Sequence, residues 1–378
     1  MILPNSSNQN KRLLGIDLFR GIAAYGVVFI HGLGEIPRNQ NALLISNFFV
    51  AFCVPFFLVT SFYFSIKLLL STSTSNYLNN RLKKIIIPYF AWTVIYLLAR
   101  LFGWLIGNRE SFEKLIADPI NIIFFGASGV QLYFLPMLFC GTVAAIPVTK
   151  VFKNIQNISL LFLFLFLSIG LVELIVKAGN DFVLGEGIAF KQIIYFLSVS
   201  NSWLFQLMRL VFVILVWIIK CLPYIIFNII INHYQSQKFL QKYIDICYQE
   251  KSIRLIILLI PLLISIIYIY NIQVIFWLIP YILLIYAIVI SELISKSAPI
   301  SWIAKKVGYL SFGIYLVHAL ITAGFLPVIA KFYPKIITIQ LTVLILIVSS
   351  LLIFFISVMI IRLILLNKNA AKILLAIY

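Results

Sequence analysis

Two side chains that could do chemistry, Arg20 and His31, lie eleven residues apart in the first long apolar run of the chain. On an α-helix, eleven residues turn through about 1100°, within about 20° of three full turns, and rise about 16 Å. Both side chains would therefore lie on one face of a helix at different depths. A cation at one depth and an imidazole at the other would suit a long ligand with an anionic head and a reactive tail.

This pair also has a purely structural alternative. Asp17 lies three residues before Arg20, where the two side chains could form an ion pair, and His31 could cap a backbone carbonyl. Glu173 is an acid within another apolar run, and it could pair with Arg100 or orient an imidazole. Arg100 could equally reach toward a membrane surface. Asp17 could also orient Arg20 rather than act itself.

A basic segment, Arg81, Lys83 and Lys84, precedes Pro88 and suits a short surface helix over 75–87 that leads into an apolar run. Clustered cations favour phosphate groups, but the same charges could enforce membrane topology or bind anionic lipid. Later in the chain, Ser311, Tyr315 and His318 follow at i, i+4 and i+7. They share one helix face and could line a cavity or simply pack between helices. His233, at the end of an apolar run, is most simply a surface histidine.

The elements that must position these residues are membrane helices. Of the 378 residues 63% are apolar and only 11% are charged, which excludes a water-soluble domain. Ten apolar runs have about the length that spans a bilayer: 14–34, 45–66, 88–107, 131–148, 158–176, 203–232, 255–270, 273–291, 308–327 and 337–364. The sequence predicts an all-α, polytopic membrane protein. The run 203–232 contains Pro223 and could be one span, or a span plus an interfacial helix, which leaves an eleven-helix count as the alternative.

The net charge of +18 is explained by lysines and arginines that gather in cytoplasmic loops, and it does not require nucleic acid as a partner. With ten spans and both termini cytoplasmic, the most basic loops fall on the inside. We expect a stub over 1–12, one transmembrane domain over 13–366 and a cytoplasmic tail over 367–378. The four cysteines have no metal spacing, so neither a disulfide framework nor a metal site is predicted. Phosphate loops, HExxH helices and G-x-S-x-G elbows are also missing.

Four segments together resemble the acyltransferase-3 family of integral membrane enzymes. GIDLFRGIAAYGVVFIH, Gly15 to His31, is similar to its R-x10-H signature, and Arg81 to Tyr89 to its R-x-x-R-I-x-P segment. VPFFLVTSFYF, which contains Ser61, resembles its P-x-F-F-x-x-S-G-Y stretch. VGYLSFGIYLVH, which ends at His318, resembles its late L-G-x-x-S-Y-G-I-Y-L-x-H block.

The resemblance runs from the first span to the ninth, and three of its departures from the family pattern lie in the motifs that would form the site. Lys84 replaces the second Arg of R-x-x-R, Phe62 follows Ser61 where Gly is usual, and Phe312 replaces Tyr. Lys84 keeps the positive charge but lacks the bidentate fork of arginine, which weakens the expectation of tight phosphate geometry there.

The resemblance implies an enzyme that moves an acyl group, by default acetyl, from acyl-coenzyme A (acyl-CoA) to a hydroxyl of a cell-surface or lipid-linked carbohydrate. It transfers groups other than amino-acyl groups and lies in the bacterial inner (plasma) membrane, in contact with membrane lipid. Arg20, Arg81, Lys83 and Lys84 would bind the donor's phosphates. His31 would act as general base or carry the acyl group transiently, and the cavity would be lined by Asp17, Ser61, Glu173, Ser311, Tyr315 and His318.

Two other functional classes compete with the acyltransferase. A glycolipid or small-anion transporter would use the intramembrane Arg20 and His31 as a substrate path without covalent chemistry. Such transporters usually have paired helix interruptions, whereas this chain has one clear candidate, near Pro223. The third class is a membrane sensor or scaffold that kept the fold and lost activity, which retention of both Arg20 and His31 disfavours.

Overall fold

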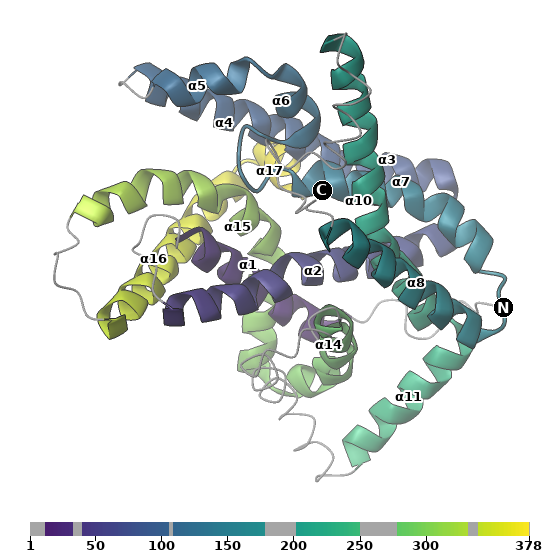
Figure 1. Ribbon diagram of the computed structural model, residues 1–378. Helices are drawn as coiled ribbons and strands as arrows, with labels where there is room; N and C mark the ends of the chain where they lie inside the picture. Colours follow the sequence, from purple (N-terminus) through teal and green to yellow (C-terminus); the bar gives the residue numbers. More distant parts are fainter. Residues whose placement is uncertain are drawn as a thin grey trace. The chain divides into compact units, whose positions relative to one another are not determined.

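The computed structural model describes residues 12–32, 40–105, 109–177, 202–249, 278–331 and 339–377, and every regular element in these ranges is a helix (Figure 1). The expected all-α, polytopic membrane class is confirmed. The helices are α1 (Leu14–Gly32), α2 (Gln40–Ser71), α3 (Thr74–Arg81), the π-helix η2 (Leu82–Ile86), α4 (Ile87–Leu105), α5 (Arg109–Ile116), α6 (Pro119–Phe125), α7 (Phe134–Phe152), α8 (Ile158–Lys177), α10 (Ser202–Asn232), α11 (Tyr234–Gln249), α14 (Ile279–Lys296), α15 (Ala298–Lys331), α16 (Ile339–Leu365) and α17 (Lys368–Leu375).

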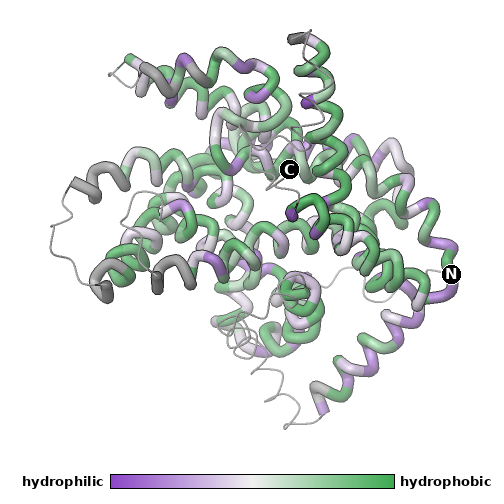
Figure 2. Tube along the Cα trace, viewed as in Figure 1, coloured by the Kyte–Doolittle hydropathy of each residue, from purple (hydrophilic) through white to green (hydrophobic). Residues whose placement is uncertain are grey.

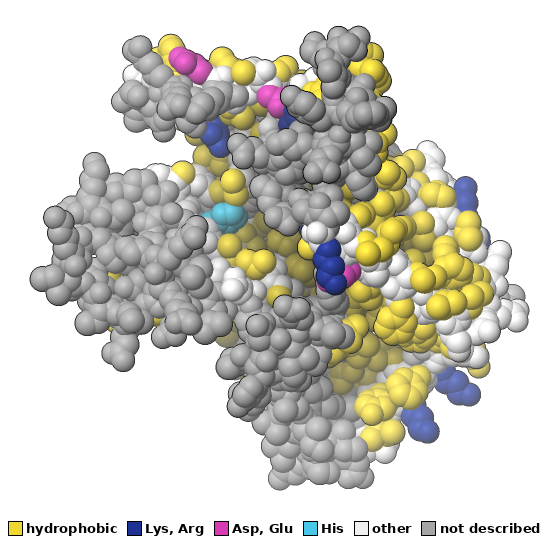
Figure 3. All heavy atoms as spheres, in the orientation of Figure 1, with side chains coloured by type: hydrophobic (Ala, Val, Ile, Leu, Met, Phe, Trp, Pro, Cys, Tyr) yellow, Lys and Arg dark blue, Asp and Glu magenta, His cyan; other side chains and the backbone are white. Residues whose placement is uncertain are grey.

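Within the described residues, nine stretches are long and apolar enough to cross a membrane. Each corresponds to one of the ten predicted spans, and the tenth, 255–270, lies outside the described residues. Figure 2 shows the hydrophobic residues running along these helices and more hydrophilic residues along α11. The face drawn in Figure 3 carries broad hydrophobic areas with few charged side chains, as expected for a surface in contact with lipid.

Two segments that the sequence left open are continuous helices. Residues 203–232 lie within α10, a single helix of 31 residues that passes through Pro223 without a break. The short helix expected over 75–87 is α3, but it does not stop at Pro88. It passes through the π-helix η2 directly into α4, and Thr74–Leu105 forms one candidate span.

The chain forms two compact units. Unit 2 comprises Ile2–Ser61 and Tyr234–Leu366, and in it α1 packs against α14, α15 and α16 (Figure 1). Glycines allow this close approach. A Cβ atom on Gly15 would lie 1.9 Å from the backbone oxygen of Ala287, and one on Gly308 would lie 2.5 Å from Cβ of Asp17. Because both positions hold glycine, α1 can meet α14 and α15 backbone to backbone.

Unit 1 comprises Phe62–His233 and Asn367–Tyr378. In it α10 packs against α7 and α8, and α4 packs against α5 and α17. Asp118 caps the N-terminus of α6 and pairs with Arg209 of α10 at 2.6 Å. The segment 367–378, which the sequence predicts as a tail, contains α17, and Nε1 of Trp92 donates a hydrogen bond to the carbonyl of Leu374 at 2.8 Å.

Candidate active site

Helix α1 carries the two residues that the sequence singles out first. It is continuous from Leu14 to Gly32, so Arg20 and His31 lie on one face, about 16 Å apart along the axis. The same helix also packs closely against its neighbours through two glycines, Gly15 and Gly21. A Cβ atom added at Gly15 would clash with α14, and one added at Gly21 would clash with α15. The α1 sequence therefore combines a packing face with two ionisable groups.

The ion pair of Asp17 with Arg20, which the sequence left as an alternative, is not formed. The Asp17 carboxylate instead accepts a short hydrogen bond from Nε of Arg12, whose Nη2 also donates to the carbonyl of Lys305 at 3.1 Å. Arg12 precedes α1, and its side chain reaches the Asp17 carboxylate from outside the helix. Among the described residues, the Arg20 side chain has no ion pair or hydrogen bond at contact distance, although the charge of Asp17 still acts on it.

The structure brings His31 and His318 together, although 286 residues separate them in the chain. Their ring centroids are 5.1 Å apart, with His31 on α1 and His318 on α15. The ring of Tyr315 lies 6.0 Å from that of His318 and 5.9 Å from that of Phe57 on α2. Ser61 follows Phe57 by one helical turn. Unit 2 alone thus assembles two imidazoles with a phenol beside them.

The hydrogen bonds around His318 distinguish it from its neighbours on the helix. Its Nδ1 lies 3.1 Å from the carbonyl of Ile314, and its Nε2 is buried without a hydrogen-bond partner among the described residues. Ser311, one turn earlier still, donates its hydroxyl to the carbonyl of Gly308 at 2.8 Å. Ser311 is therefore satisfied by its own helix, which suits a packing role, whereas His318 keeps an unused nitrogen.

The predicted phosphate ligands Arg81, Lys83 and Lys84 lie in unit 1, at the junction of α3 and η2. Lys83 and Lys84 are exposed, while Arg81 has a buried Nε without a hydrogen-bond partner among the described residues. The guanidinium carbon of Arg81 lies 5.5 Å from the ring centroid of Tyr77, a cation–π contact. Arg20 belongs to unit 2, so the grouping of all four cations remains a prediction.

Tyr77 is the residue on whose ring Arg81 lies, and the sequence did not single it out. Its hydroxyl donates to the carbonyl of Thr142 at 3.3 Å and so accepts from Ser65, 2.6 Å away. These bonds fix the ring on which Arg81 stacks, because they tie α3 to α2 and α7. The i, i+4 spacing of Tyr77 and Arg81 in the sequence could have predicted this contact, because it places a ring and a cation on the same helix face.

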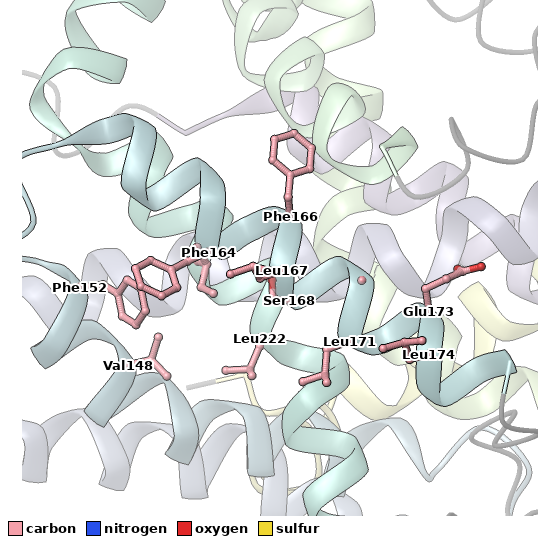
Figure 4. Close-up of a pocket in the computed structure, with 12 residues that line it drawn as sticks. Val148, Phe152, Phe164, Phe166, Leu167, Ser168, Leu171, Glu173, Leu174 and Leu222 are labelled. Atoms are coloured by element: carbon pink, nitrogen blue, oxygen red, sulfur yellow. The ribbon is translucent and has the colours of Figure 1, made fainter.

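Glu173 lines an open groove of about 760 Å³ between α7, α8 and α10. Figure 4 shows Glu173 at one end of it, while the rings of Phe152 and Phe164 meet edge to face at the other end. The carboxylate of Glu173 pairs with Lys177 at 3.3 Å. Nε of Arg100 donates to the carbonyl of Ser128 at 2.8 Å. The pair of Glu173 with Arg100 that the sequence allowed is therefore not formed. His233, expected at the surface, is buried, with 6% of its area exposed.

The fold and the residues on α1 and α15 define a polytopic α-helical membrane protein with an arginine and a histidine pair in its spans. The sequence profile of the acyltransferase-3 family, described as an acyltransferase domain, matches residues 13–362. The chain therefore belongs to the acyltransferase-3 family. Membership implies an acyltransferase enzyme that uses an acyl donor. No curated protein and no solved structure matches the chain.

Proposed function

We propose that this protein transfers an acyl group, most simply acetyl, from acyl-CoA to a hydroxyl of a cell-surface or lipid-linked carbohydrate in the bacterial plasma membrane. The observation that carries the proposal is the contact of His31 with His318, whose ring centroids are 5.1 Å apart, together with Arg20 on the same face of α1 as His31. Family membership supports the transfer of an acyl group and favours it over the transporter and scaffold interpretations.

The proposed reaction uses His31 as general base. The acceptor hydroxyl attacks the thioester carbonyl while His31 takes the hydroxyl proton. When the tetrahedral intermediate collapses, the carbon–sulfur bond breaks, the coenzyme A thiolate leaves, and the imidazolium of His31 returns the proton to it. In the alternative order, His31 attacks first and carries the acyl group to the acceptor. Both orders balance without another reactant.

The charged groups are proposed to bind the donor's nucleotide head. Coenzyme A carries its phosphates far from its thioester, so a site for it needs cations at one place and a base at another. Arg20 lies about 16 Å along α1 from His31, which fits that division. Arg81, Lys83 and Lys84 supply three further cations, of which Arg81 is held against Tyr77. Charge-assisted contacts of guanidinium with phosphate are strong, which supports this role.

The test is transfer of radiolabel from acetyl-CoA to surface glycan in membranes that hold the wild type, Arg20→Ala or His31→Ala at matched expression. We expect label with the wild type and less than about 1% of it with His31→Ala, because general-base catalysis contributes about 10²- to 10⁴-fold. His233→Gln is the matched control, since it changes another buried histidine, and it should retain the label. Label that survives both site substitutions would remove His31 and Arg20 from the mechanism. The absence of label from the wild type would contradict this donor and acceptor.

A further inference from the structure

His318 presents a specific nitrogen to the space beside His31. A backbone carbonyl only accepts hydrogen bonds, so the 3.1 Å contact of Nδ1 with the carbonyl of Ile314 assigns the ring proton to Nδ1. In the neutral ring Nε2 then carries a lone pair. This nitrogen is buried and has no hydrogen-bond partner among the described residues, while the whole side chain is 0% exposed. Buried polar atoms without a partner are uncommon and need an explanation.

The neighbouring imidazole is close enough to supply that partner. Each ring nitrogen lies about 1.1 Å from its ring centre, so the centroid separation of 5.1 Å leaves about 3 Å between nitrogens that face each other, which is a hydrogen-bond length. The rings are inclined at 41°, and the last side-chain torsion of a histidine has a broad energy well. A modest rotation of His31 therefore brings one of its N–H groups to Nε2 of His318.

The fold holds His318 more firmly than His31. His318 is fixed by its bond to Ile314, and the next turn is closed by Thr322, whose hydroxyl donates to the carbonyl of His318 at 2.9 Å. The ring of Tyr315 packs 6.0 Å away on the same helix. His31 is only partly buried and lies near the end of α1. The ring with more fixed contacts, His318, can thus orient that of His31.

We propose that His318 is a positioning residue for the proposed reaction: its Nε2 accepts a hydrogen bond from His31, which fixes the tautomer of His31 and turns its unprotonated nitrogen toward the acceptor hydroxyl. A base that is oriented by a third group is the usual arrangement in enzymes that activate a hydroxyl. The effect of this hydrogen bond on the reaction rests on the proposed function, but the bond itself would be present in the protein without substrate.

The kinetic test compares His318→Leu, which removes the acceptor nitrogen, with His318→Gln, which can place an oxygen near it. We expect kcat to fall about 10- to 100-fold in His318→Leu, the size of effect known for groups that orient metal-bound histidines, with the KM for acetyl-CoA changed less than about twofold. His318→Gln should recover part of kcat. The double variant His31→Ala/His318→Leu should be no slower than His31→Ala, since both act through one base. His233→Gln, which changes a buried histidine away from this pair, is the matched control and should keep kcat.

A spectroscopic test does not depend on activity. The chain has three histidines, so the ¹⁵N signals of its imidazoles can be assigned with single substitutions. We expect His318 to be protonated at Nδ1 in the wild type, and the signals of His31, but not those of His233, to shift in His318→Gln and His318→Leu. A His318 protonated at Nε2, or a His31 unaffected by both substitutions, would overturn the proposal. If the wild type transferred no acyl group, the proposed function would be wrong, but this measurement would still decide whether the hydrogen bond exists.

Discussion

The ion pair of Asp17 bears on whether Arg20 can bind an anion. Asp17 is three residues away and was the obvious partner, yet Arg12 occupies its carboxylate and is itself anchored to the carbonyl of Lys305. A cation within a span is costly unless it is paired or has a function. Because Arg20 has no ion pair with a described residue, we expect it to bind an anion.

Replacement of Arg20 should therefore weaken donor binding. Hydrogen bonds to charged groups contribute about 1.5–3 kcal/mol, so Arg20→Ala should raise the KM for acetyl-CoA about 10- to 100-fold. Arg20→Lys should raise it less, because lysine keeps the charge but loses the bidentate fork. The control is acetyl-pantetheine, which carries the thioester without the nucleotide head. If Arg20→Ala slows this short donor as much as acetyl-CoA, Arg20 does not bind the head.

At the scale of helices, the close contact of α1 with α14 depends on Gly15. Its backbone N–H donates to the hydroxyl of Ser291 at 2.9 Å, and an added Cβ would lie 1.9 Å from the carbonyl oxygen of Ala287. The backbone of Ala287 cannot rotate away as a side chain can. Gly170 of α8 is the matched case, because nothing lies within 4 Å of a Cβ added there.

Gly15→Ala should accordingly destabilise the protein by about 3 kcal/mol, at the upper end of the cost of overpacking. Gly170→Ala should be neutral or stabilise by up to about 1 kcal/mol, since alanine favours helix more than glycine. Thermal unfolding of the purified protein in detergent measures both. Equal unfolding temperatures for the two variants would mean that α1 and α14 are farther apart than the structure has them.

The ion pair of Asp118 with Arg209 joins α6 to α10. The side chain of Arg209 is 6% exposed and also lies over the ring of Phe125, 5.2 Å from its centroid. Asp118→Asn keeps the helix cap, because asparagine also accepts from backbone N–H groups, but it leaves a buried cation without its counterion. We expect a loss of about 3 kcal/mol in the free energy of unfolding. Asp118→Asn/Arg209→Met should recover most of it, and a double variant as unstable as the single one would refute the electrostatic explanation.

The sequence predicts the helices well because a bilayer imposes about 20 apolar residues on every span. It also places Arg20 and His31 on one face, since helical periodicity fixes directions within one helix. Periodicity cannot tell which helix that face meets, so the contact of His31 with His318 came only from the structure. For a related reason, the sequence did not show that the segment 367–378 contains a helix. Helix α17 is short and polar, and its position depends on Trp92, which is distant in sequence.

For the whole molecule, the remaining question is which ends of the helices face the cytoplasm. If α10 crosses once, as its unbroken course from Ser202 to Asn232 suggests, Lys153 and Lys238 lie on the same side and Lys177 on the other. The count of lysines and arginines in the loops then puts Lys153 and Lys238 inside. A second crossing within 203–232 would invert every later loop and move its basic residues outside.

Single cysteines test this arrangement directly. We propose Lys153→Cys, Lys177→Cys and Lys238→Cys in a variant whose four native cysteines are replaced by serine or alanine. A membrane-impermeant maleimide added to intact cells should label position 177 alone, and lysed cells should allow labelling at all three. Because moving basic loops across a membrane is unfavourable, we expect no mixed population. Labelling of position 238 but not 153 in intact cells would mean that α10 does not make a single crossing, and it would place α14, α15 and α16 in the opposite orientation.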